Sequence, residues 1–398
     1  MKKKVGLLIK DLYSGGAERA ICRLSYILDD EYEIYMILFN GDNIDYDFKG
    51  KLINLDIKLK KGLFGKIIVT FKRILKVRKV KKQLGLNTTI SYLENANLIN
   101  ILSMTNDKKI VSVRNYKTAE KNDGIINNIK SILMRLLYKY ADYVVPVSEV
   151  IKNELIKSYN INENKIKVIY NAYDIDEIKK SSLEKLEEKY KKLFDKRDVI
   201  CTVGRIVYQK GFWNLIKVIK ILKDDLPNIL LIIIGDELDR NISENIKKMI
   251  RENDLEENVV LMGVQKNPFK YISKAKCYVM SSLFEGFPNA LVEAMACEVP
   301  VVSVDCKSGP REILFENFHV ENNIKNMVMA DYGIIVPEFD KNLDFNINNI
   351  QYQHVEMAEA IKKIINNNTL NIKYKKYGKK RAEVFNYKVC KKKYSELI

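Results

Sequence analysis

Short apolar runs alternate with longer amphipathic stretches along the first half of the chain, and no other feature restricts the possible folds as strongly. These runs occupy residues 5–9, 34–39, 89–93, 110–113, 143–147 and 168–170. Apolar runs of this length are typical of buried strands, and strands that alternate with helices form parallel, doubly wound sheets. The first half is therefore predicted to be a Rossmann-like α/β domain.

The same rhythm restarts after a charged stretch at residues 179–197. The second set of apolar runs occupies residues 199–203, 230–235, 259–262, 277–280, 301–304 and 333–336. A chain of 398 residues is long enough for two domains that each bury a core. We therefore predict two Rossmann-like domains, residues 1–175 and 176–383, which face each other across a cleft.

Composition limits the cellular setting. The six cysteines are scattered and form no Cys-x-x-Cys pair, which favours free thiols in a reducing cytosol over disulfides or a zinc site. The first apolar run ends at Ile9 and is too short for an export signal, and the longest later run, residues 229–234, is too short to span a membrane. The chain is predicted to be soluble or peripheral on a membrane.

Two glutamates, Glu285 and Glu293, bracket a glycine, a proline and the start of an apolar helix. Pro288 at the first helical position leaves the next three backbone N–H groups without intrahelical partners, and such donors suit a diphosphate. Glu293 lies in an apolar run, where a carboxylate needs donors such as the hydroxyls of a ribose. A helix cap followed by a salt-bridged glutamate is the alternative, and the segment alone leaves both open.

Three further motifs follow predicted strands: Gly15-Gly16, Gly204-Arg205 with Lys210-Gly211, and residues 305–312. In doubly wound sheets, ligands bind beyond the carboxyl ends of the strands. Each motif by itself fits an ordinary solvated loop. Four such segments after four strands, counting residues 285–293, favour a ligand site.

With these motifs in this order, the sequence resembles the family 4 glycosyltransferases, which are retaining enzymes of the GT-B fold that use nucleotide sugars. The resemblance covers nearly the whole chain and is carried by Gly15-Gly-Ala-Glu-Arg19, Val147-Ser148, residues 169–174, Val203-Gly-Arg205 with Lys210-Gly211, Ile234-Gly-Asp236, residues 285–293 and Ser308-Gly-Pro-Arg-Glu312. The sequence is similar in particular to bacterial enzymes that build capsule, O-antigen or lipid-linked glycans. The resemblance also implies that a last helix, residues 384–398, packs back on the N-terminal domain.

The resemblance implies three catalytic residues. Arg205 and Lys210 neutralise the donor diphosphate, which suits a guanidinium fork and an ammonium group, and Glu285 holds hydroxyls of the transferred sugar. Glu293 is implied to hold the ribose, and Gly16 to close the diphosphate site from the N-terminal domain. The other expected donor-binding residues are Gly263 and Val264 beside the base, and Gly204, Phe287, Asn289, Ala290 and Leu291.

Retaining transfer is expected to occur on one face of the sugar, with the departing diphosphate oxygen accepting the acceptor's proton. No protein nucleophile is then needed, and the two histidines, His319 and His354, are expected at the surface because they lie in polar segments. Two Asp-x-Asp matches, residues 45–47 and 174–176, suggest a metal only weakly. Because two basic residues already face the diphosphate, we expect no metal and no cofactor besides the donor.

The acceptor side departs from the family pattern. Many relatives have a histidine after the fourth N-terminal strand, whereas this chain has Arg114 and Asn115. An arginine stays protonated and cannot act as a general base, so we expect Arg114 to grip the acceptor or orient the sugar, with Asn115 and Gly15 beside it. A second departure is Glu237, where relatives often have glycine.

Eleven lysines and arginines and no acid lie between Lys58 and Lys82. Apolar residues recur there at helical spacing, which predicts a basic amphipathic helix of the kind that lies on anionic bilayers. Its apolar side is expected to pack on the protein's own sheet, with basic residues facing lipid headgroups. The predicted membrane contacts are Lys66, Lys72, Arg73, Lys76 and Lys79.

The resulting prediction is a retaining glycosyltransferase on the cytoplasmic face of the cell membrane. It moves a hexose or N-acetylhexosamine from a nucleotide sugar, with UDP favoured, to a lipid-linked or polysaccharide acceptor. Nucleic acid is not expected as a partner, because the basic stretch lacks a recognised binding module. A nucleotide-sugar 2-epimerase and a non-catalytic sugar-nucleotide-binding paralogue remain the alternatives.

Overall fold

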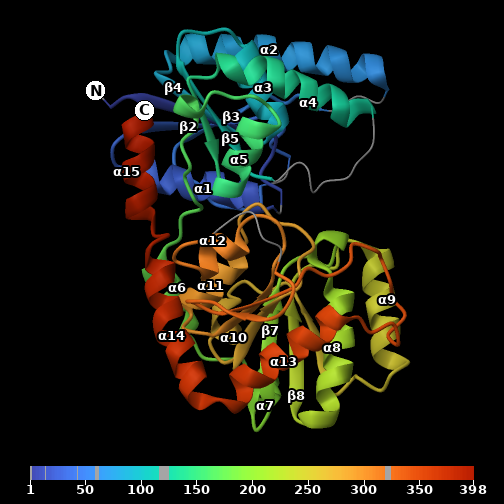
Figure 1. The fold of residues 1–398 in the computed structure, drawn as a ribbon. Coiled ribbons are helices and arrows are strands. Elements are labelled where there is room, and N and C mark those ends of the chain that lie inside the picture. Colours follow the sequence, from blue (N-terminus) through green and yellow to red (C-terminus); the bar gives the residue numbers. More distant parts are fainter. Residues whose placement is uncertain (1, 14, 43, 59–61, 116–124, 319–323) are drawn as a thin grey trace. The chain divides into compact units, whose positions relative to one another are not determined.

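The computed structural model describes the chain except residues 1, 14, 43, 59–61, 116–124 and 319–323. It divides the chain into two compact units, one formed by residues 1–172 and 387–398 and the other by residues 173–386 (Figure 1). The chain leaves the first unit after residue 172 and returns to it at residue 387. These two positions lie three residues from the predicted boundaries, 175 and 384. Each unit is described below by itself.

The N-terminal unit is built on a parallel six-stranded sheet in the order β3-β2-β1-β4-β5-β6. The strands are β1 (Lys4–Ile9), β2 (Glu33–Leu38), β3 (Lys51–Asn54), β4 (Thr88–Tyr92), β5 (Lys108–Val113) and β6 (Tyr143–Pro146). The predicted Rossmann-like sheet is confirmed. Two details differ, because β3 is a mostly exposed edge strand without an apolar run and residues 168–170 form no strand.

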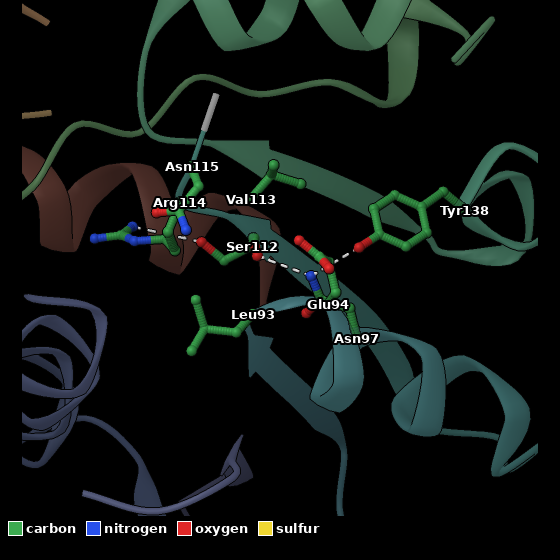
Figure 2. A pocket seen from close by; sticks show the side chains of 8 residues that line it. All are labelled: Leu93, Glu94, Asn97, Ser112, Val113, Arg114, Asn115 and Tyr138. Atoms are coloured by element: carbon green, nitrogen blue, oxygen red, sulfur yellow. Dashed lines mark hydrogen bonds between the residues drawn. The ribbon is translucent and has the colours of Figure 1, made fainter. Parts of the chain in front are cut away.

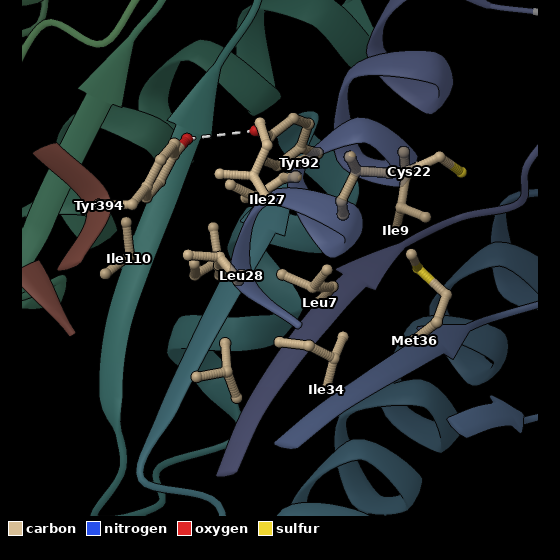
Figure 3. Close-up of a cluster of buried hydrophobic side chains, with 14 of the residues drawn as sticks. Leu7, Ile9, Cys22, Ile27, Leu28, Ile34, Met36, Tyr92, Ile110 and Tyr394 are labelled. Carbon is tan, nitrogen blue, oxygen red and sulfur yellow. Dashed lines mark hydrogen bonds between the residues drawn. The ribbon is translucent and has the colours of Figure 1, made fainter. Parts of the chain in front are cut away.

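Helices cover both faces of this sheet: α1 (Gly16–Leu28), α2 (Leu63–Leu84), α3 (Glu94–Leu102), α4 (Ile125–Leu137), α5 (Glu149–Lys157) and α15 (Tyr387–Leu397). On one face, side chains from β1, α1 and α15 form a continuous core that includes Leu7, Ile27 and Tyr394 (Figure 3). On the other face, Leu8 and Ile37 pack with Val69 and Val77 of α2. The last helix of the chain thus completes the N-terminal unit.

The C-terminal unit contains a seven-stranded sheet in the order β12-β13-β11-β10-β7-β8-β9. The strands are β7 (Asp198–Val203), β8 (Ile229–Ile234), β9 (Val259–Gly263), β10 (Cys277–Met280), β11 (Val301–Val304), β12 (Val328–Met329) and β13 (Ile334–Val336). All pairs are parallel except the short edge strand β12, which the sequence pattern did not predict. The second predicted α/β sheet is therefore also confirmed.

Its helices are α6 (Ile175–Ser182), α7 (Glu188–Phe194), α8 (Phe212–Asp225), α9 (Arg240–Arg251), α10 (Phe269–Ile272), α11 (Asn289–Ala296), α12 (Pro310–Leu314), α13 (Tyr352–Asn366) and α14 (Asn368–Glu383). In both sheets the strand order reverses once, between β1 and β4 in the first and between β7 and β10 in the second. In open α/β sheets, the crevice beyond the carboxyl ends of the strands at such a reversal is where ligands bind.

Helix α2 faces the opposite way from the prediction. Its buried positions are Val69, Arg73, Val77 and Lys81. Its exposed positions include the large apolar residues Phe64 (83% exposed), Ile67, Ile68, Phe71 (61%) and Leu75. The expectation that the apolar side packs on the sheet is therefore wrong for these residues, which face outward among the lysines.

Candidate functional site

Lys210 and Glu285 meet at the strand reversal of the C-terminal sheet. Lys210 ends the 3₁₀ turn Tyr208–Lys210 beyond β7, and Glu285 follows β10. The Lys210 Nζ lies 2.5 Å from Oε1 of Glu285, and both side chains are mostly buried. A Cβ added to Gly204 would lie 3.1 Å from Cε of Lys210, so the lysine side chain crosses directly over this glycine. Two predicted catalytic residues are thus in direct contact.

A neighbouring amide holds the Glu285 loop. Nε2 of Gln209 donates to the carbonyl of Phe284 at 2.9 Å and lies 3.4 Å from Oε2 of Glu285. The Glu285 residue is 8% exposed, so its carboxylate is positioned by protein groups rather than by water. Sequence reasoning missed Gln209, although it stands directly before Lys210.

Helix α11 begins at Asn289, one residue later than predicted, with Pro288 as its N-cap. The backbone N–H of Leu291 donates to the Pro288 carbonyl at 3.2 Å, so this amide is used within the helix and is not available to a ligand as predicted. The Tyr173 hydroxyl donates to Oδ1 of Asn289 at 2.7 Å. Glu293 is 2% exposed on the same helix.

The turn before α11 is braced by residues that follow β11. Ser308 and Gly309 both have positive φ, 74° and 96°, and the Ser308 hydroxyl donates to the Gly286 carbonyl at 2.6 Å. A Cβ on Gly309 would lie 2.3 Å from Cδ of Pro288, so only glycine permits this approach. Pro310 occupies the first turn of α12, where a proline is well tolerated. The segment at residues 305–312 therefore supports the start of α11.

The other predicted donor-binding residues lie at the same edge of the C-terminal sheet. Arg205 is half-buried just beyond Gly204 and β7. Gly263 ends β9 with φ 66°, and Val264 after it is 71% exposed. Phe287 is buried, with its ring 5.3 Å from that of Phe385.

The predicted glycine site of the N-terminal unit lies at the start of α1. Gly15 is the N-cap and Gly16 the first helical residue. A Cβ on Gly15 would lie 1.9 Å from a carboxylate oxygen of Glu18, so the Glu18 side chain folds over this glycine. The space that we expected a ligand to enter at Gly15 is therefore occupied by a carboxylate.

Arg114 is anchored within the N-terminal unit. Its guanidinium group lies 4.6 Å from the ring centre of Tyr92, donates to Oδ1 of Asn171, and has Nη1 3.4 Å from the Ser112 hydroxyl. The residue is 8% exposed, whereas Asn115 after it is exposed. Both residues line a cavity at the carboxyl ends of β4 and β5 (Figure 2).

The five predicted membrane-contact residues fall into two groups. Lys66, Lys72, Lys76 and Lys79 are exposed on α2, whereas Arg73 is buried. Arg73 is 5% exposed: it donates to the Ile57 carbonyl at 3.1 Å and lies over the Phe39 ring, so its assignment to the membrane surface is wrong. The Lys76 ammonium donates to the carbonyl of Leu55 at 2.6 Å.

Histidine placement corrects another expectation. His354 is fully buried, accepts the Gln351 N–H at Nδ1 (2.9 Å), and lies 3.0 Å from Oδ1 of Asn214 through Nε2. Burial lowers the pKa of His354 to about 4. It is a core residue, not a surface residue, while His319 lies outside the described residues.

The described part of the chain contains no group of three or more His, Cys, Asp or Glu side chains placed to hold a metal ion. It also contains no helix with the length and hydropathy of a membrane span. The six cysteines are free and buried. Burial raises the pKa of Cys306, with Glu285 as the next largest cause, so this thiol stays protonated beside the site.

Two doubly wound sheets, with a lysine–glutamate pair beyond the strands of the second, define the GT-B class of glycosyltransferases. Sequence profiles agree: Glycosyltransferase Family 4 matches residues 14–177, and Glycosyl transferases group 1 matches residues 184–331. The chain is 32% identical over 363 residues to an uncharacterised glycosyltransferase of Methanocaldococcus jannaschii, with 88% of each chain covered. The chain belongs to glycosyltransferase family 4.

A second relative has a named activity. The chain is 30% identical over 390 residues, 96% of each chain, to the N-acetylgalactosamine-N,N'-diacetylbacillosaminyl-diphospho-undecaprenol 4-alpha-N-acetylgalactosaminyltransferase of Campylobacter jejuni. Among solved structures, Anabaena HepE in complex with UDP and glucose has a TM-score of 0.75 at 16% identity, with 99% of this chain and 98% of HepE covered. At that identity the likeness establishes the fold. The protein is a glycosyltransferase, as its family and its relatives show.

Proposed function

We propose that this glycosyltransferase transfers a hexose or N-acetylhexosamine from a UDP-sugar to a lipid-linked or polysaccharide acceptor, with retention of anomeric configuration and without a required metal. The observation that carries the proposal is the contact between Lys210 and Glu285 at the strand reversal of the C-terminal sheet. This pair places a cation for the diphosphate next to an acceptor of sugar hydroxyls.

Lys210 and Arg205 neutralise the donor diphosphate. Both follow β7, and the start of α11 adds the backbone N–H groups of Asn289 and Ala290 at the positive end of a helix dipole. A diphosphate leaves as a polyanion, so cations fixed next to it stabilise the transition state more than the ground state. These groups therefore favour loss of the nucleotide.

The two glutamates hold hydroxyl groups of the donor. The ion pair with Lys210 keeps Glu285 oriented towards the diphosphate region, where the transferred sugar lies. Glu293, 2% exposed on α11, is assigned to the ribose. In these roles both carboxylates accept hydrogen bonds and neither takes part in proton transfer.

Retention follows from transfer on one face of the sugar. The acceptor oxygen bonds to the anomeric carbon as the bond to the diphosphate breaks, and the hydroxyl proton moves to the departing diphosphate oxygen. This scheme needs no protein nucleophile. It suits a site whose nearby thiol, Cys306, has a pKa raised by burial.

Support for the acceptor class comes from relatives. The Campylobacter jejuni enzyme is named for a diphospho-undecaprenol substrate, and a Staphylococcus aureus relative, 30% identical over 266 residues, is a capsular polysaccharide biosynthesis glycosyltransferase. Within the N-terminal unit, we assign Gly15, Arg114 and Asn115 to the acceptor and Gly16 to the donor. Glu18 must move aside for a ligand to approach Gly15.

The proposal includes a peripheral position of the enzyme on the cytoplasmic face of the cell membrane, and the outward face of α2 supports membrane contact. Helix α3 packs against both α2 and α4, and the three helices lie side by side (Figure 1). Exposed apolar residues lie on α2 and on or just after α4: Phe64, Ile67, Ile68, Phe71, Leu75, Ile132, Leu136 and Tyr140. Exposed lysines of α2 lie among its exposed apolar residues, and each contributes about 1 kcal/mol to binding at an anionic lipid surface.

The test is a nucleotide-release assay. UDP-linked hexoses and N-acetylhexosamines are screened by thermal shift, and the best binder is incubated with a lipid-diphosphate-linked N-acetylhexosamine acceptor in buffer with and without EDTA. We expect acceptor-dependent release of UDP, resistance to EDTA, and a product with the donor's anomeric configuration by NMR. Binding without release indicates a non-catalytic paralogue, a 2-epimeric sugar product indicates an epimerase, and inversion or EDTA sensitivity contradicts the mechanism.

A further inference from the structure

A long loop connects β13 to α13 in the C-terminal unit and packs on α8. Residues 337–351, all within the described part of the chain, form this β13–α13 loop and contain no helix or strand. Most connections in compact domains have about 4–6 residues, and longer irregular ones are usually functional or disordered. This loop is held by specific contacts, so its conformation is defined.

A buried lysine of α8 anchors the loop. Lys217 is 1% exposed, and its ammonium group donates to Oδ2 of Asp344 at 2.7 Å and to the Asn349 carbonyl at 3.2 Å. The ring of Trp213, also on α8, lies edge-on to the ring of Phe345, with the ring centres 6.0 Å apart. Because a buried ammonium group without a partner is costly, these contacts keep the loop on α8.

Hydrogen bonds within the loop make it compact. Nδ2 of Asn349 donates to Oδ2 of Asp344 at 2.8 Å, and Nε2 of Gln351 donates to Oδ2 of Asp340 at 2.6 Å. Phe339 is 4% exposed beneath the loop backbone. The loop therefore holds its outer backbone groups in fixed positions.

One of these groups, the carbonyl of Lys341, binds the turn that carries Lys210. The Tyr208 hydroxyl donates to the Lys341 carbonyl, and Tyr208 begins the 3₁₀ turn that ends at Lys210. The Tyr208 ring is stacked on the ring of Trp213, with the ring centres 5.8 Å apart and an interplanar angle of 29°. The hydroxyl of Tyr208 is thus held by the loop, and its ring by α8.

The segment between β10 and Glu285 holds the other side of the same turn. The Leu283 N–H donates to the Gln209 carbonyl at 2.8 Å, and the Ser281 hydroxyl donates to the Lys210 carbonyl at 2.8 Å. The turn therefore lies between this segment and the β13–α13 loop, with hydrogen bonds to both. Loss of the bond to the loop should change the position of the Lys210 ammonium group while the bonds on the other side keep the turn folded.

We infer that Tyr208 is a positioning residue: its hydroxyl links the β13–α13 loop to the turn and sets where the Lys210 ammonium group meets the donor diphosphate. This inference deepens the proposed function and rests on it. Tyr208 acts through Lys210 and needs no contact with the substrate. Its removal must therefore affect the nucleotide and have no effect where the Lys210 ammonium group is absent.

The experiment measures UDP binding by isothermal titration, and donor and acceptor kinetics, in full-length Tyr208→Phe, Lys210→Ala and the double variant. Tyr208→Phe keeps the ring on Trp213 and removes only the hydroxyl. Loss of one hydrogen bond predicts a fall of about 3- to 10-fold in UDP affinity and in kcat/KM for the UDP-sugar, with KM for acceptor unchanged. In the Lys210→Ala background, which itself binds UDP more weakly, Tyr208→Phe should cause no further loss.

Tyr374→Phe is the matched control, because the Tyr374 hydroxyl donates to the Ala330 carbonyl at 3.1 Å in the same unit. This change also removes one hydroxyl–carbonyl hydrogen bond, and Tyr374 is only 1% exposed. It should lower the melting temperature at least as much as Tyr208→Phe does, because a buried carbonyl loses its partner. UDP affinity and donor kinetics should stay at wild-type values, which separates positioning from a general loss of stability.

Three results would contradict the inference, and they differ in what else they contradict. UDP affinity within about twofold of wild type in Tyr208→Phe, beside a clear loss in Lys210→Ala, overturns this inference and leaves the proposed function intact. A loss that is equally large with and without Lys210 shows that the Tyr208 hydroxyl contacts the nucleotide directly, and it also overturns the inference alone. Wild-type protein that binds no UDP, or Lys210→Ala that binds it equally well, overturns the proposed function and this inference together.

Discussion

The ammonium group of Lys210 lies 2.5 Å from a carboxylate oxygen of Glu285 across the strand reversal of the C-terminal sheet. The two residues come from segments 75 positions apart and have little exposure to water. Charge-assisted hydrogen bonds are strong, and this one couples the proposed diphosphate site to the proposed sugar site. The pair should therefore behave as a unit when either member is changed.

Lys210→Ala and Glu285→Gln should each lower kcat/KM for the UDP-sugar by about 10²–10³, in the range seen when a group that stabilises the transition state is removed. They should differ in ground-state binding. Lys210→Ala should weaken UDP itself, because the lysine faces the diphosphate, whereas Glu285→Gln should weaken the UDP-sugar and leave UDP unchanged. Isothermal titration with UDP and steady-state kinetics separate these effects.

The double variant tests the coupling between Lys210 and Glu285. Residues that act as a unit are not additive, so the double variant should lose much less than the product of the two single losses. Lys274→Ala, an exposed lysine before β10, is the control and should keep wild-type kinetics. Full additivity would contradict the coupled arrangement.

Membrane binding should depend on exposed apolar residues of α2 as well as on its lysines. Phe64→Ser with Phe71→Ser should lower flotation with anionic liposomes at both low and high salt, because each inserted phenylalanine contributes up to about 1.5–3 kcal/mol. Changing Lys66, Lys72 and Lys79 to Gln should lower flotation chiefly at low salt, where headgroup attraction is unscreened. Co-flotation measured at about 50 mM and about 500 mM salt distinguishes apolar insertion from attraction to the headgroups.

The control for this surface replaces Ile372 and Tyr377, exposed apolar residues on α14 in the C-terminal unit, with Ser. It should float as the wild type does.

Arg73→Gln tests the structural role of a residue on the same helix, because Arg73 is buried and donates to the Ile57 carbonyl. It should lower the melting temperature without a specific loss of flotation, and wild-type protein that stays unbound at low salt would contradict the membrane proposal.

Local pattern was sufficient for most of the fold. The buried strands of both sheets have apolar runs, so eleven of the twelve predicted strand runs coincide with observed strands, whereas the exposed edge strand β3 and the short edge strand β12 were not predicted. Local pattern failed on α2, because burial of Arg73 and Lys81 depends on distant partners: the Ile57 carbonyl for one and Asp107, at 3.0 Å, for the other. Apolar periodicity cannot include such partners, and it therefore assigned the wrong face to the core.

Strand order also explains which residues of the site could be predicted from the sequence. Lys210, Glu285 and Gly204 follow strands, so their convergence at one edge could be expected from parallel topology. The positive φ of Ser308 and the folding of Glu18 over Gly15 could not, because each depends on tertiary contacts.

Arg114 should contribute to both stability and acceptor use. Arg114→Met removes the hydrogen bond to Asn171 while keeping an apolar side chain against Tyr92, so the melting temperature should fall by a few degrees, for about 1–3 kcal/mol of lost stability. If Arg114 also orients the acceptor, kcat/KM for acceptor should fall with little change in UDP binding. Differential scanning fluorimetry and acceptor kinetics measure the two effects. An unchanged kcat/KM for acceptor would leave Arg114 with a structural role only.

His354 should make the C-terminal unit acid-sensitive. Burial holds the pKa of His354 at about 4, below the ordinary 6.5. Between pH 4 and pH 6.5 the unfolded chain therefore binds a proton at His354 that the folded chain does not bind. Stability is therefore fully present above pH 6.5 and is lost as the pH falls towards 4, by about 3 kcal/mol for this group. His354→Gln should be less stable at pH 7.5, because the bond to Asn214 is altered, yet its stability should decline less between pH 6.5 and 4. Urea unfolding at several pH values gives the free energy of unfolding of the wild type and of His354→Gln as a function of pH. The difference between the two curves cancels the contribution of the other titrating groups. Parallel curves would show that His354 is not the cause of the acid sensitivity.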